Sequence, residues 1–283
     1  MVYEPIAVAS MLGLERPSFP LAPRMGNVHL WYLDLRDGSA MAEAAYEEIL
    51  AADERLRARQ YVFAQHRRRF RAARAGLRLV LGGYLGCDAA SVLLIHDVLG
   101  KPRLEGHHVG GLTFNLSHSG DLALVAITTG REVGVDIEQV RGVEDPLSLT
   151  RLNFHPDEHR SLLAQEGFEL AAAFLRIWTK KEAYLKATGK GLAGSLGDFS
   201  VAEEAPEDPL VLLVDPEGKP WTICSLGISA SIEAALAISA HDLKRIWMIQ
   251  RSIQGNFDPS ELIPGALPQG RREFASPDSV TDA

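Results

Sequence analysis

Apolar residues recur at two different periods along the chain, and the change of period marks the elements that we expect. Between residues 65 and 85 they return every three or four positions, as on a helix with one buried face: Phe70, Ala73, Leu77, Val80 and Tyr84. Residues 40–59 also have a helical pattern. Residues 122–129 and 133–138 alternate as strands do, and the Thr-Gly-Arg-Glu between them is typical of a hairpin.

A second set of helices and strands is expected in the C-terminal part. One helix begins near Pro156, because proline favours the first helical position, and a longer one covers about 169–188 and ends at Gly189. Short strands follow at about residues 198–202, 209–214, 219–225 and 229–239. The order of helices followed by strands thus occurs twice, which predicts an α+β protein of two halves with similar architecture.

The composition is that of an ordinary globular protein, with 283 residues, of which 46% are hydrophobic and 23% charged. The two cysteines, Cys87 and Cys224, are too few for a disulfide framework and lack metal-ligand spacing, which favours a reducing compartment. No run reaches the roughly 18 apolar residues that a membrane helix needs. We therefore expect a cytoplasmic protein with no membrane association.

The charge of the chain is unevenly distributed. Its formal net charge of -8 argues against a nucleic-acid binder, yet residues 55–78 hold nine arginines and no acid. Four of them recur as a helical stripe: Arg67, Arg71, Arg74 and Arg78. Such a stripe is either a solvated basic face or a site for an anionic partner, and both interpretations are open.

Two carboxylates, Asp136 and Glu138, interrupt an apolar strand. Residues two apart share a face of a strand, so both carboxylates point the same way while Val135 and Ile137 point into the core. Neighbouring carboxylates repel unless a cation or solvent separates them, and Mg²⁺ prefers such oxygens together with substrate phosphates. An exposed strand with two solvated acids would explain the same residues.

The long helix at residues 169–188 carries a further acid and base. Glu182 and Lys186 lie one turn apart, with the acid nearer the N-terminus, which is the favourable order for an ordinary ion pair. Alternatively, Glu182 is a third magnesium ligand and Lys186 a base or a phosphate contact. The helix alone does not choose between these hypotheses.

Small polar residues at Phe114–Gly120 would let the backbone approach a phosphate, and His118 could donate to it. A Ser117 nucleophile has less support, because no Gly-x-Ser-x-Gly elbow is present. Lys101 is either a second phosphate contact or a plain turn lysine. His155 and His159 have one spacing used by zinc ligands, but a helix N-terminus explains them adequately.

Four motifs follow one another in order: Gly100–Pro102, Phe114–Ser119, Val133–Glu138 and Trp178–Leu192. With these motifs the chain resembles 4'-phosphopantetheinyl transferases of the surfactin-synthetase-activating type, over roughly residues 30–240. The resemblance implies a monomer of two pseudo-symmetric α+β halves, each a small antiparallel sheet packed on a long helix. The expected parts are an extension at 1–25, a coenzyme A-side half at 26–132, a metal and catalytic half at 133–250 and a disordered tail at 251–283.

The resemblance also assigns roles by position. Asp136, Glu138 and Glu182 would hold Mg²⁺, for which Mn²⁺ could substitute, and the catalytic residues would be Glu138, Glu182 and Lys186. Contacts with coenzyme A would come from a larger set: Arg59, Arg69, Lys101, Pro102, Asn115, Ser117, His118, Lys181 and Lys186.

The implied reaction moves the 4'-phosphopantetheine arm of coenzyme A to a serine of an apo acyl or peptidyl carrier protein and releases adenosine 3',5'-bisphosphate. The metal would stabilise charge on the pyrophosphate, and either Glu138 or Lys186 would accept the serine proton. The arginines would suit the phosphates and an acidic carrier. The rivals are an inactive homologue that binds carrier proteins and a different magnesium phosphotransferase or phosphohydrolase. The latter would lack the usual glycine-rich phosphate loop.

Overall fold

The computed structural model describes residues 23, 27–36, 38–98, 100–105, 111–191, 196–202, 210–239 and 245–252. The extension expected at residues 1–25 lies outside this part of the chain, apart from residue 23. The tail expected from residue 251 lies outside it beyond residue 252.

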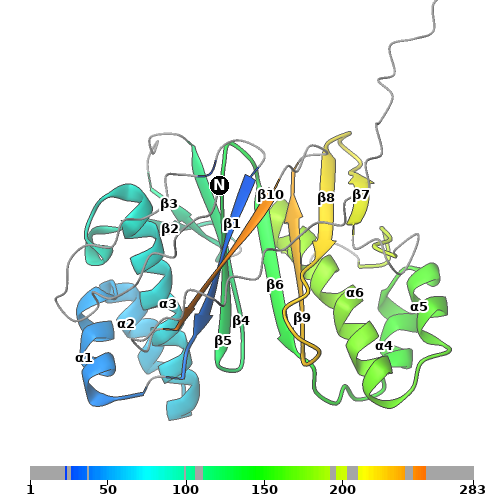
Figure 1. Cartoon of the computed structure of the whole chain (residues 1–283), viewed down its shortest axis with the longest axis horizontal. Coiled ribbons are helices and arrows are strands. Elements are labelled where there is room, and N and C mark those ends of the chain that lie inside the picture. Colours follow the sequence, from blue (N-terminus) through cyan, green and yellow to red (C-terminus); the bar gives the residue numbers. More distant parts are fainter. Residues whose placement is uncertain are drawn as a thin grey trace, which may run out of the picture.

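The N-terminal part forms a helical layer and the strands of a first sheet (Figure 1). Its elements are β1 (Asn27–Asp34), α1 (Ala40–Ile49), α2 (Ala52–Arg59), α3 (Ala64–Leu85), a 3-10 turn (Ala89–Ser91), β2 (Leu94–His96), β3 (Pro102–Leu104), β4 (Leu112–Ser119) and β5 (Leu122–Thr129). The helix expected at 65–85 is confirmed as α3, which ends at Gly86 in the left-handed conformation. Residues 40–59 form two helices instead of one, because the backbone is extended at Leu50 and Ala51.

The C-terminal part repeats this order of helices and strands. Its elements are β6 (Val133–Gln139), α4 (Pro146–Asn153), α5 (Pro156–Leu162), α6 (Gly167–Thr188), β7 (Leu210–Val214), β8 (Pro220–Ser225), β9 (Ile232–Ile238) and β10 (Arg245–Ser252). The helices expected near Pro156 and at 169–188 are confirmed, and the latter ends at Gly189 as predicted. The strand expected at 198–202 is wrong, because the backbone there bonds to buried side chains of α5 and α6.

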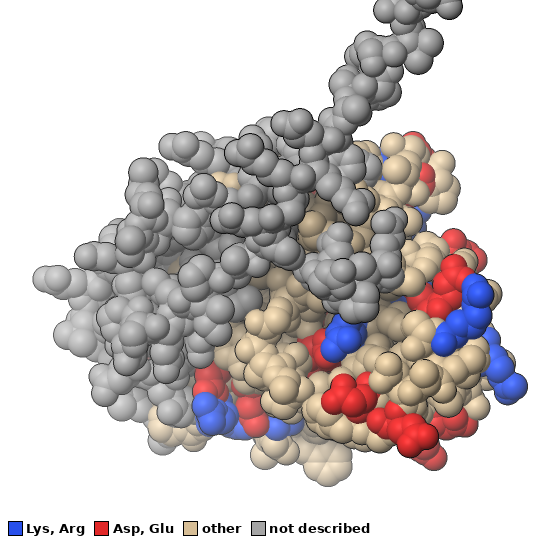
Figure 2. Space-filling view, turned by 45° about the vertical axis from the view of Figure 1, so that its right-hand side comes forward, with Lys and Arg blue, Asp and Glu red and all other residues tan. Residues whose placement is uncertain are grey.

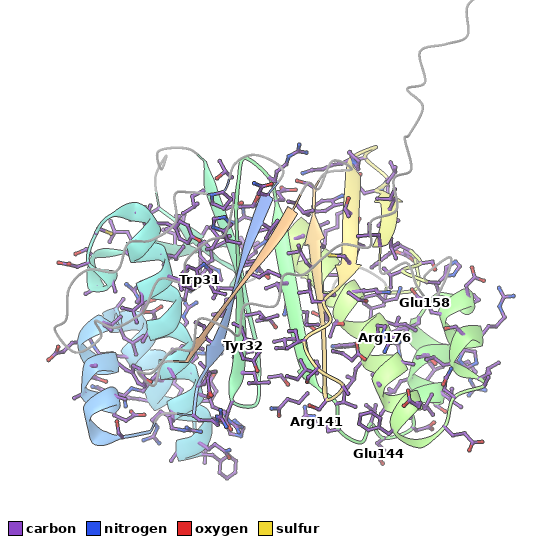
Figure 3. The ribbon with its side chains drawn as sticks, viewed as in Figure 1. Trp31, Tyr32, Arg141, Glu144, Glu158 and Arg176 are labelled. Carbon is purple, nitrogen blue, oxygen red and sulfur yellow. The ribbon has the colours of Figure 1, made fainter. Side chains whose placement is uncertain are left out.

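Helices, sheet, sheet and helices lie side by side in four layers (Figure 1). On β1 the side chains alternate: Trp31, labelled in Figure 3, and Leu33 pack with the core of α3. Val28 and Leu30 pack between the two sheets. The α+β class inferred from the sequence is therefore confirmed. Each sheet has one face against its own helices and the other face against the second sheet.

The two sheets are separate. The first has the order β10-β1-β5-β4 and the second β6-β9-β8-β7, while β2 and β3 form a small hairpin. The hairpin predicted between residues 122–129 and 133–138 is therefore wrong: β5 pairs with β4 and β1, whereas β6 pairs with β9. Residues 130–132 instead carry the chain from one sheet to the other. As a result β4 and β6 become the facing edge strands of the two sheets.

One strand crosses between the halves. β10 follows the last strand of the second sheet, yet it pairs in parallel with β1 along all of Asn27–Asp34. Residues 245–250, expected within the C-terminal half at 133–250, therefore belong to the first sheet, which is mixed rather than purely antiparallel. Residues 251 and 252, expected in the tail, belong to this strand.

In the described part of the chain, no helix is both long and apolar enough to cross a membrane. The face that Figure 2 turns forward carries acidic and basic side chains with uncharged residues between them. Oppositely charged residues also pair across elements, as Arg176 of α6 does with Glu233 of β9 at 2.9 Å.

Candidate active site

Polar side chains join the two edge strands where backbone bonds do not. Alternate residues of β4 reach β6: the Val135 N–H donates to Asn115 Oδ1 at 2.9 Å, Ser117 Oγ donates to Asp136 Oδ1 at 2.7 Å, and Ser119 Oγ donates to Glu138 Oε2 at 2.6 Å. Asn115, Ser117 and Ser119 share one face because residues two apart in a strand do so. These bonds fix the position of both carboxylates on β6.

Helix α6 lies directly on β6. At Gly134 the contact is so close that a Cβ would collide with the Ala183 carbonyl oxygen and stand 2.5 Å from the Ala187 nitrogen. Only glycine permits this approach. It places the side chains of Glu182 and Lys186 beside the carboxylate face of β6.

Lys186 connects both halves at this point. Its Nζ donates to Asp136 Oδ1 at 2.5 Å and to Ser117 Oγ at 2.9 Å. Its ion-pair partner is therefore Asp136 on β6, rather than Glu182 one turn earlier on the same helix. Asp136 is buried, with 4% of its surface exposed, whereas the Lys186 side chain is 30% exposed, so the pair lies at the edge of the interior.

The three carboxylates influence one another electrostatically. Burial raises the pKa of Glu182; the charge of Lys186 opposes this shift, and the charges of Asp136 and Glu138 add to it. Burial also raises the pKa of Glu138, against the hydrogen bond from Ser119. Two buried oxygens, Asp136 Oδ2 and Glu182 Oε1, have no hydrogen-bond partner. Such atoms cost free energy unless a ligand or cation satisfies them.

These donors have the chemistry that Mg²⁺ prefers, with hard oxygens and uncompensated negative charge. Their side chains are not assembled around one point, since no group of three or more His, Cys, Asp or Glu residues in the described ranges is placed to hold a metal ion. The donor set therefore fits the ion, while its convergence on one ion stays a prediction.

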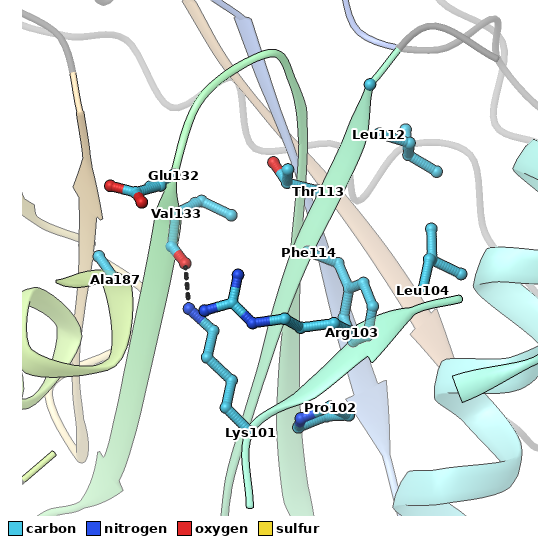
Figure 4. Close-up of a pocket in the computed structure, with 11 residues that line it drawn as sticks. Lys101, Pro102, Arg103, Leu104, Leu112, Thr113, Phe114, Glu132, Val133 and Ala187 are labelled. Carbon is cyan, nitrogen blue, oxygen red and sulfur yellow. Dashed lines mark hydrogen bonds between the residues drawn. The ribbon is translucent and has the colours of Figure 1, made fainter. Parts of the chain in front are cut away.

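Lys101 reaches across from the first half. Its Nζ donates to the carbonyl of Lys186 and, at 3.4 Å, to the carbonyl of Val133; Figure 4 shows the second bond. Burial, together with the charge of Arg103, lowers the pKa of Lys101 to about 8. A cavity of about 460 Å³ opens beside these residues and is also lined by Pro102.

Basic groups lie near the other end of the seam between β4 and β6. Arg69 of α3 forms a bidentate pair with Asp121 at 2.8 and 2.9 Å, and Arg68 joins the same carboxylate. The surface of His118 is exposed. Partial desolvation of its ring lowers its pKa, and the charges of Lys186 and Arg69 lower it further. Arg59 is exposed at the end of α2, 3.9 Å from Glu47.

Two family models match this chain: the 4'-phosphopantetheinyl transferase superfamily over residues 132–238 and the N-terminal domain of 4'-phosphopantetheinyl transferases over residues 40–130. The 4'-phosphopantetheinyl transferase HetI of Nostoc sp. is 39% identical over 75% of this chain and 87% of its own. The chain belongs to the 4'-phosphopantetheinyl transferase superfamily.

Two further relatives of this transferase are less similar. The phosphopantetheinyl transferase of Thraustochytrium sp. is 36% identical over 57% of this chain and 61% of its own. The 4'-phosphopantetheinyl transferase Sfp of Bacillus subtilis is 26% identical over 60% of this chain and 73% of its own. Membership of the family and transferase activity, expected from the four motifs, are confirmed.

The arginines of the transferase have a mostly structural use that the sequence did not indicate. Arg74 and Arg78 are buried and pair with the buried Glu54 at 3.0 and 2.5 Å. Arg71 pairs with Glu43 and Glu47 of α1. Acids of α1 and α2 therefore occupy Arg71, Arg74 and Arg78, and only Arg67 of the stripe is exposed to solvent.

Lys181 does not reach the carboxylate cluster of the transferase. Its side chain is fully buried, 2.9 Å from Glu158 Oε1, and donates to the carbonyls of Leu196 and Phe199. Figure 3 shows Glu158 within the C-terminal half. The expectation of a coenzyme A contact fails for this lysine because its ammonium is enclosed by the core.

Several contributors to the site were missed in the sequence. Ser119 continues the alternation of Asn115 and Ser117, so the period of the strand could have identified it. Asp121 gave no local signal, because only the fold brings it to Arg68 and Arg69. The two histidines lie at a helix N-terminus, as expected. The Nδ1 of His155 accepts from the Asp157 N–H in the first turn of α5, and the Nδ1 of His159 hydrogen-bonds with the Thr150 hydroxyl.

Proposed function

We propose that the transferase moves the 4'-phosphopantetheine arm of coenzyme A to a serine of an apo acyl or peptidyl carrier protein, with Mg²⁺ as its metal. The observation that carries the proposal is the cluster of Asp136, Glu138, Glu182 and Lys186 at the seam of the two halves. It combines hard oxygen donors, two of them unpartnered, with a cation suited to phosphate oxygens.

Asp136, Glu138 and Glu182 would hold Mg²⁺, or Mn²⁺ in its place. When bound, the ion would neutralise charge on the pyrophosphate as adenosine 3',5'-bisphosphate leaves. Asp136 is anchored for this role by Ser117, and Glu138 by Ser119. Glu182 comes from the facing helix and leaves one buried oxygen free for a ligand.

Glu138 is the better proton acceptor for the carrier serine. Its carboxylate already accepts a hydrogen bond from Ser119, so its oxygens can accept a proton at this position. Lys186 is held as a donor against Asp136 and Ser117, which suits binding of a phosphate oxygen better than accepting a proton. We therefore assign the base to Glu138 and the anion contact to Lys186.

The basic end of the seam supports coenzyme A binding. His118 is exposed and lies within the electrostatic influence of Lys186 and Arg69, which favours an anion there. Arg69 is already paired with Asp121, which orients its guanidinium. A single chain acting in the cytoplasm stays a prediction from the sequence, as does the identity of the carrier.

Intact-mass measurement of an apo carrier protein tests the proposal directly. After incubation with the transferase, coenzyme A and Mg²⁺, we expect the carrier to gain the mass of the phosphopantetheine arm, and a chelator to prevent the gain. Complex formation with no gain in mass would instead indicate an inactive carrier-binding homologue. Hydrolysis of nucleotides with no transfer would indicate a different phosphotransferase or phosphohydrolase.

A further inference from the structure

Lys101 makes a contact between the halves that a coenzyme A ligand would not need. The lysine directly precedes β3 in the first half, and both acceptors of its ammonium belong to the second half. One acceptor is the carbonyl of Val133, the first residue of β6. The other is the carbonyl of Lys186 in the last turn of α6.

The carbonyl of Lys186 is one that the helix leaves unsatisfied. The last carbonyls of an α-helix have no partner within it, and α6 ends at Thr188. A cation at this end also complements the negative end of the helix dipole. Lys101 thus caps α6 from the opposite half, at the residue whose side chain enters the carboxylate cluster.

We propose that Lys101 is a positioning residue, whose ammonium holds the backbone of Lys186 in place so that the Lys186 side chain reaches Asp136 and the reacting phosphate. This inference rests on the proposed function. It departs from the role that the family resemblance implies for Lys101, namely a direct contact with coenzyme A.

The surroundings of the ammonium favour this role. Two of its three donors point at carbonyls of the second half, and the guanidinium of Arg103 lies beside it in the cavity (Figure 4). A phosphate in the cavity would find Arg103 more accessible, since its side chain is 52% exposed. Glu132, a further wall of the cavity, pairs with Lys219.

The first test compares Lys101→Met with Lys190→Met. Lys190 is an exposed lysine just after the same helix and pairs with Glu217. For Lys101→Met we expect kcat to fall about 10- to 100-fold, because a displaced reacting group loses alignment. The KM for coenzyme A and the preference for coenzyme A over 3'-dephospho-coenzyme A should stay as in the wild type. Lys190→Met should behave as the wild type.

The second test uses the cavity beside the lysine. In Lys101→Ala, ethylammonium at millimolar concentration should enter the space and restore part of kcat, whereas Lys101→Met, whose side chain fills that space, should not respond. If Lys101 only stabilised the fold, kcat of the folded Lys101→Ala protein would already be normal, and ethylammonium would not raise it.

Three results would overturn the inference while wild-type transfer is intact. The first is a rise in the KM for coenzyme A with loss of preference for the 3'-phosphate, which would make Lys101 a ligand. The second is unchanged kcat in Lys101→Met, or no response of Lys101→Ala to ethylammonium. The third is loss of cooperative unfolding in both Lys101 variants, which would make the lysine a support of the whole fold. Absence of transfer by the wild type would instead reject the proposed function itself.

Discussion

At the scale of single residues, the site holds negative charge that the protein does not fully compensate. Asp136 is neutralised by Lys186, but Glu182 is brought beside two other carboxylates and has a buried oxygen without a partner. Such an arrangement lowers the stability of the free protein. It is the expected signature of a position kept for a ligand rather than for the fold.

Glu182→Gln should therefore stabilise the metal-free protein at pH 7. The raised pKa of Glu182 means that its favourable contribution is complete below its ordinary pKa and is lost as the pH rises through the folded-state value. We expect the melting temperature of the variant to exceed that of the wild type by about 2 °C or more at pH 7, and the difference to vanish near pH 4. Thermal unfolding in a chelating buffer at several pH values measures this.

Glu144→Gln is the matched control for this prediction, because Glu144 is an exposed acid of the same half (Figure 3). Its melting temperature should follow that of the wild type at each pH. A Glu182→Gln protein that melts below the wild type throughout the pH range would show that the carboxylate stabilises the fold, and would contradict the electrostatic repulsion inferred at this residue.

At the scale of elements, the site depends on how closely α6 lies on β6. The helix is placed by Gly134, which has no side chain to hold the two elements apart. The strand contributes Asp136 and Glu138, and the helix contributes Glu182 and Lys186. A small change in the spacing of the two elements therefore changes the relative positions of all four groups.

Gly134→Ala tests this dependence. The added methyl would meet backbone atoms of α6, which cannot move aside singly, so we expect a loss of about 1–3 kcal/mol in the free energy of unfolding. Transfer should fall about 100-fold in the protein that remains folded. Denaturant unfolding and the carrier-mass assay measure the two effects.

Gly142→Ala is the control for the glycine change, since a Cβ at Gly142 would meet no atom within 4 Å. It should alter neither stability nor transfer by more than a small factor. Normal transfer by Gly134→Ala would mean that the helix can retreat from β6 without disturbing the site.

The elements were easier to predict from the sequence than their partners. The helical period gave α3 and α6, and the strand period placed Asp136 and Glu138 on one face with Val135 and Ile137 in the core between the sheets. The predicted pairing of β5 with β6 was wrong, because a break of three residues has the same sequence pattern in a hairpin and in a crossing between sheets. Pairing depends on contacts far apart in sequence, which a local pattern does not contain.

The same limit applies to charged residues of the site. The motifs identified Asp136, Glu138, Glu182 and Lys186, and the structure brings them to one region. Lys181 was placed wrongly, because the side of a helix that faces the core is set by tertiary packing. For the same reason, a run of arginines gave no hint that Glu54 would be buried among them.

At the scale of the whole molecule, the two halves pack sheet against sheet, and one strand, β10, joins the sheet of the other half. The edge strands β4 and β6 are joined by side chains instead of a ladder of backbone bonds, which leaves room for carboxylates between them. β10 returns from the second half to pair with β1, so the halves are connected on both sides. The side-chain bonds between β4 and β6 and the pairing of β10 with β1 thus hold the halves together, while the residues between β4 and β6 stay polar.

We propose that the carboxylates at this seam carry the transfer reaction. The most direct test is the transfer rate of Glu182→Gln, measured by the mass of an apo carrier at saturating coenzyme A, carrier and Mg²⁺. We predict a loss of about 1000-fold or more, with cooperative unfolding retained. A near-normal rate for this variant would contradict the assignment of the site.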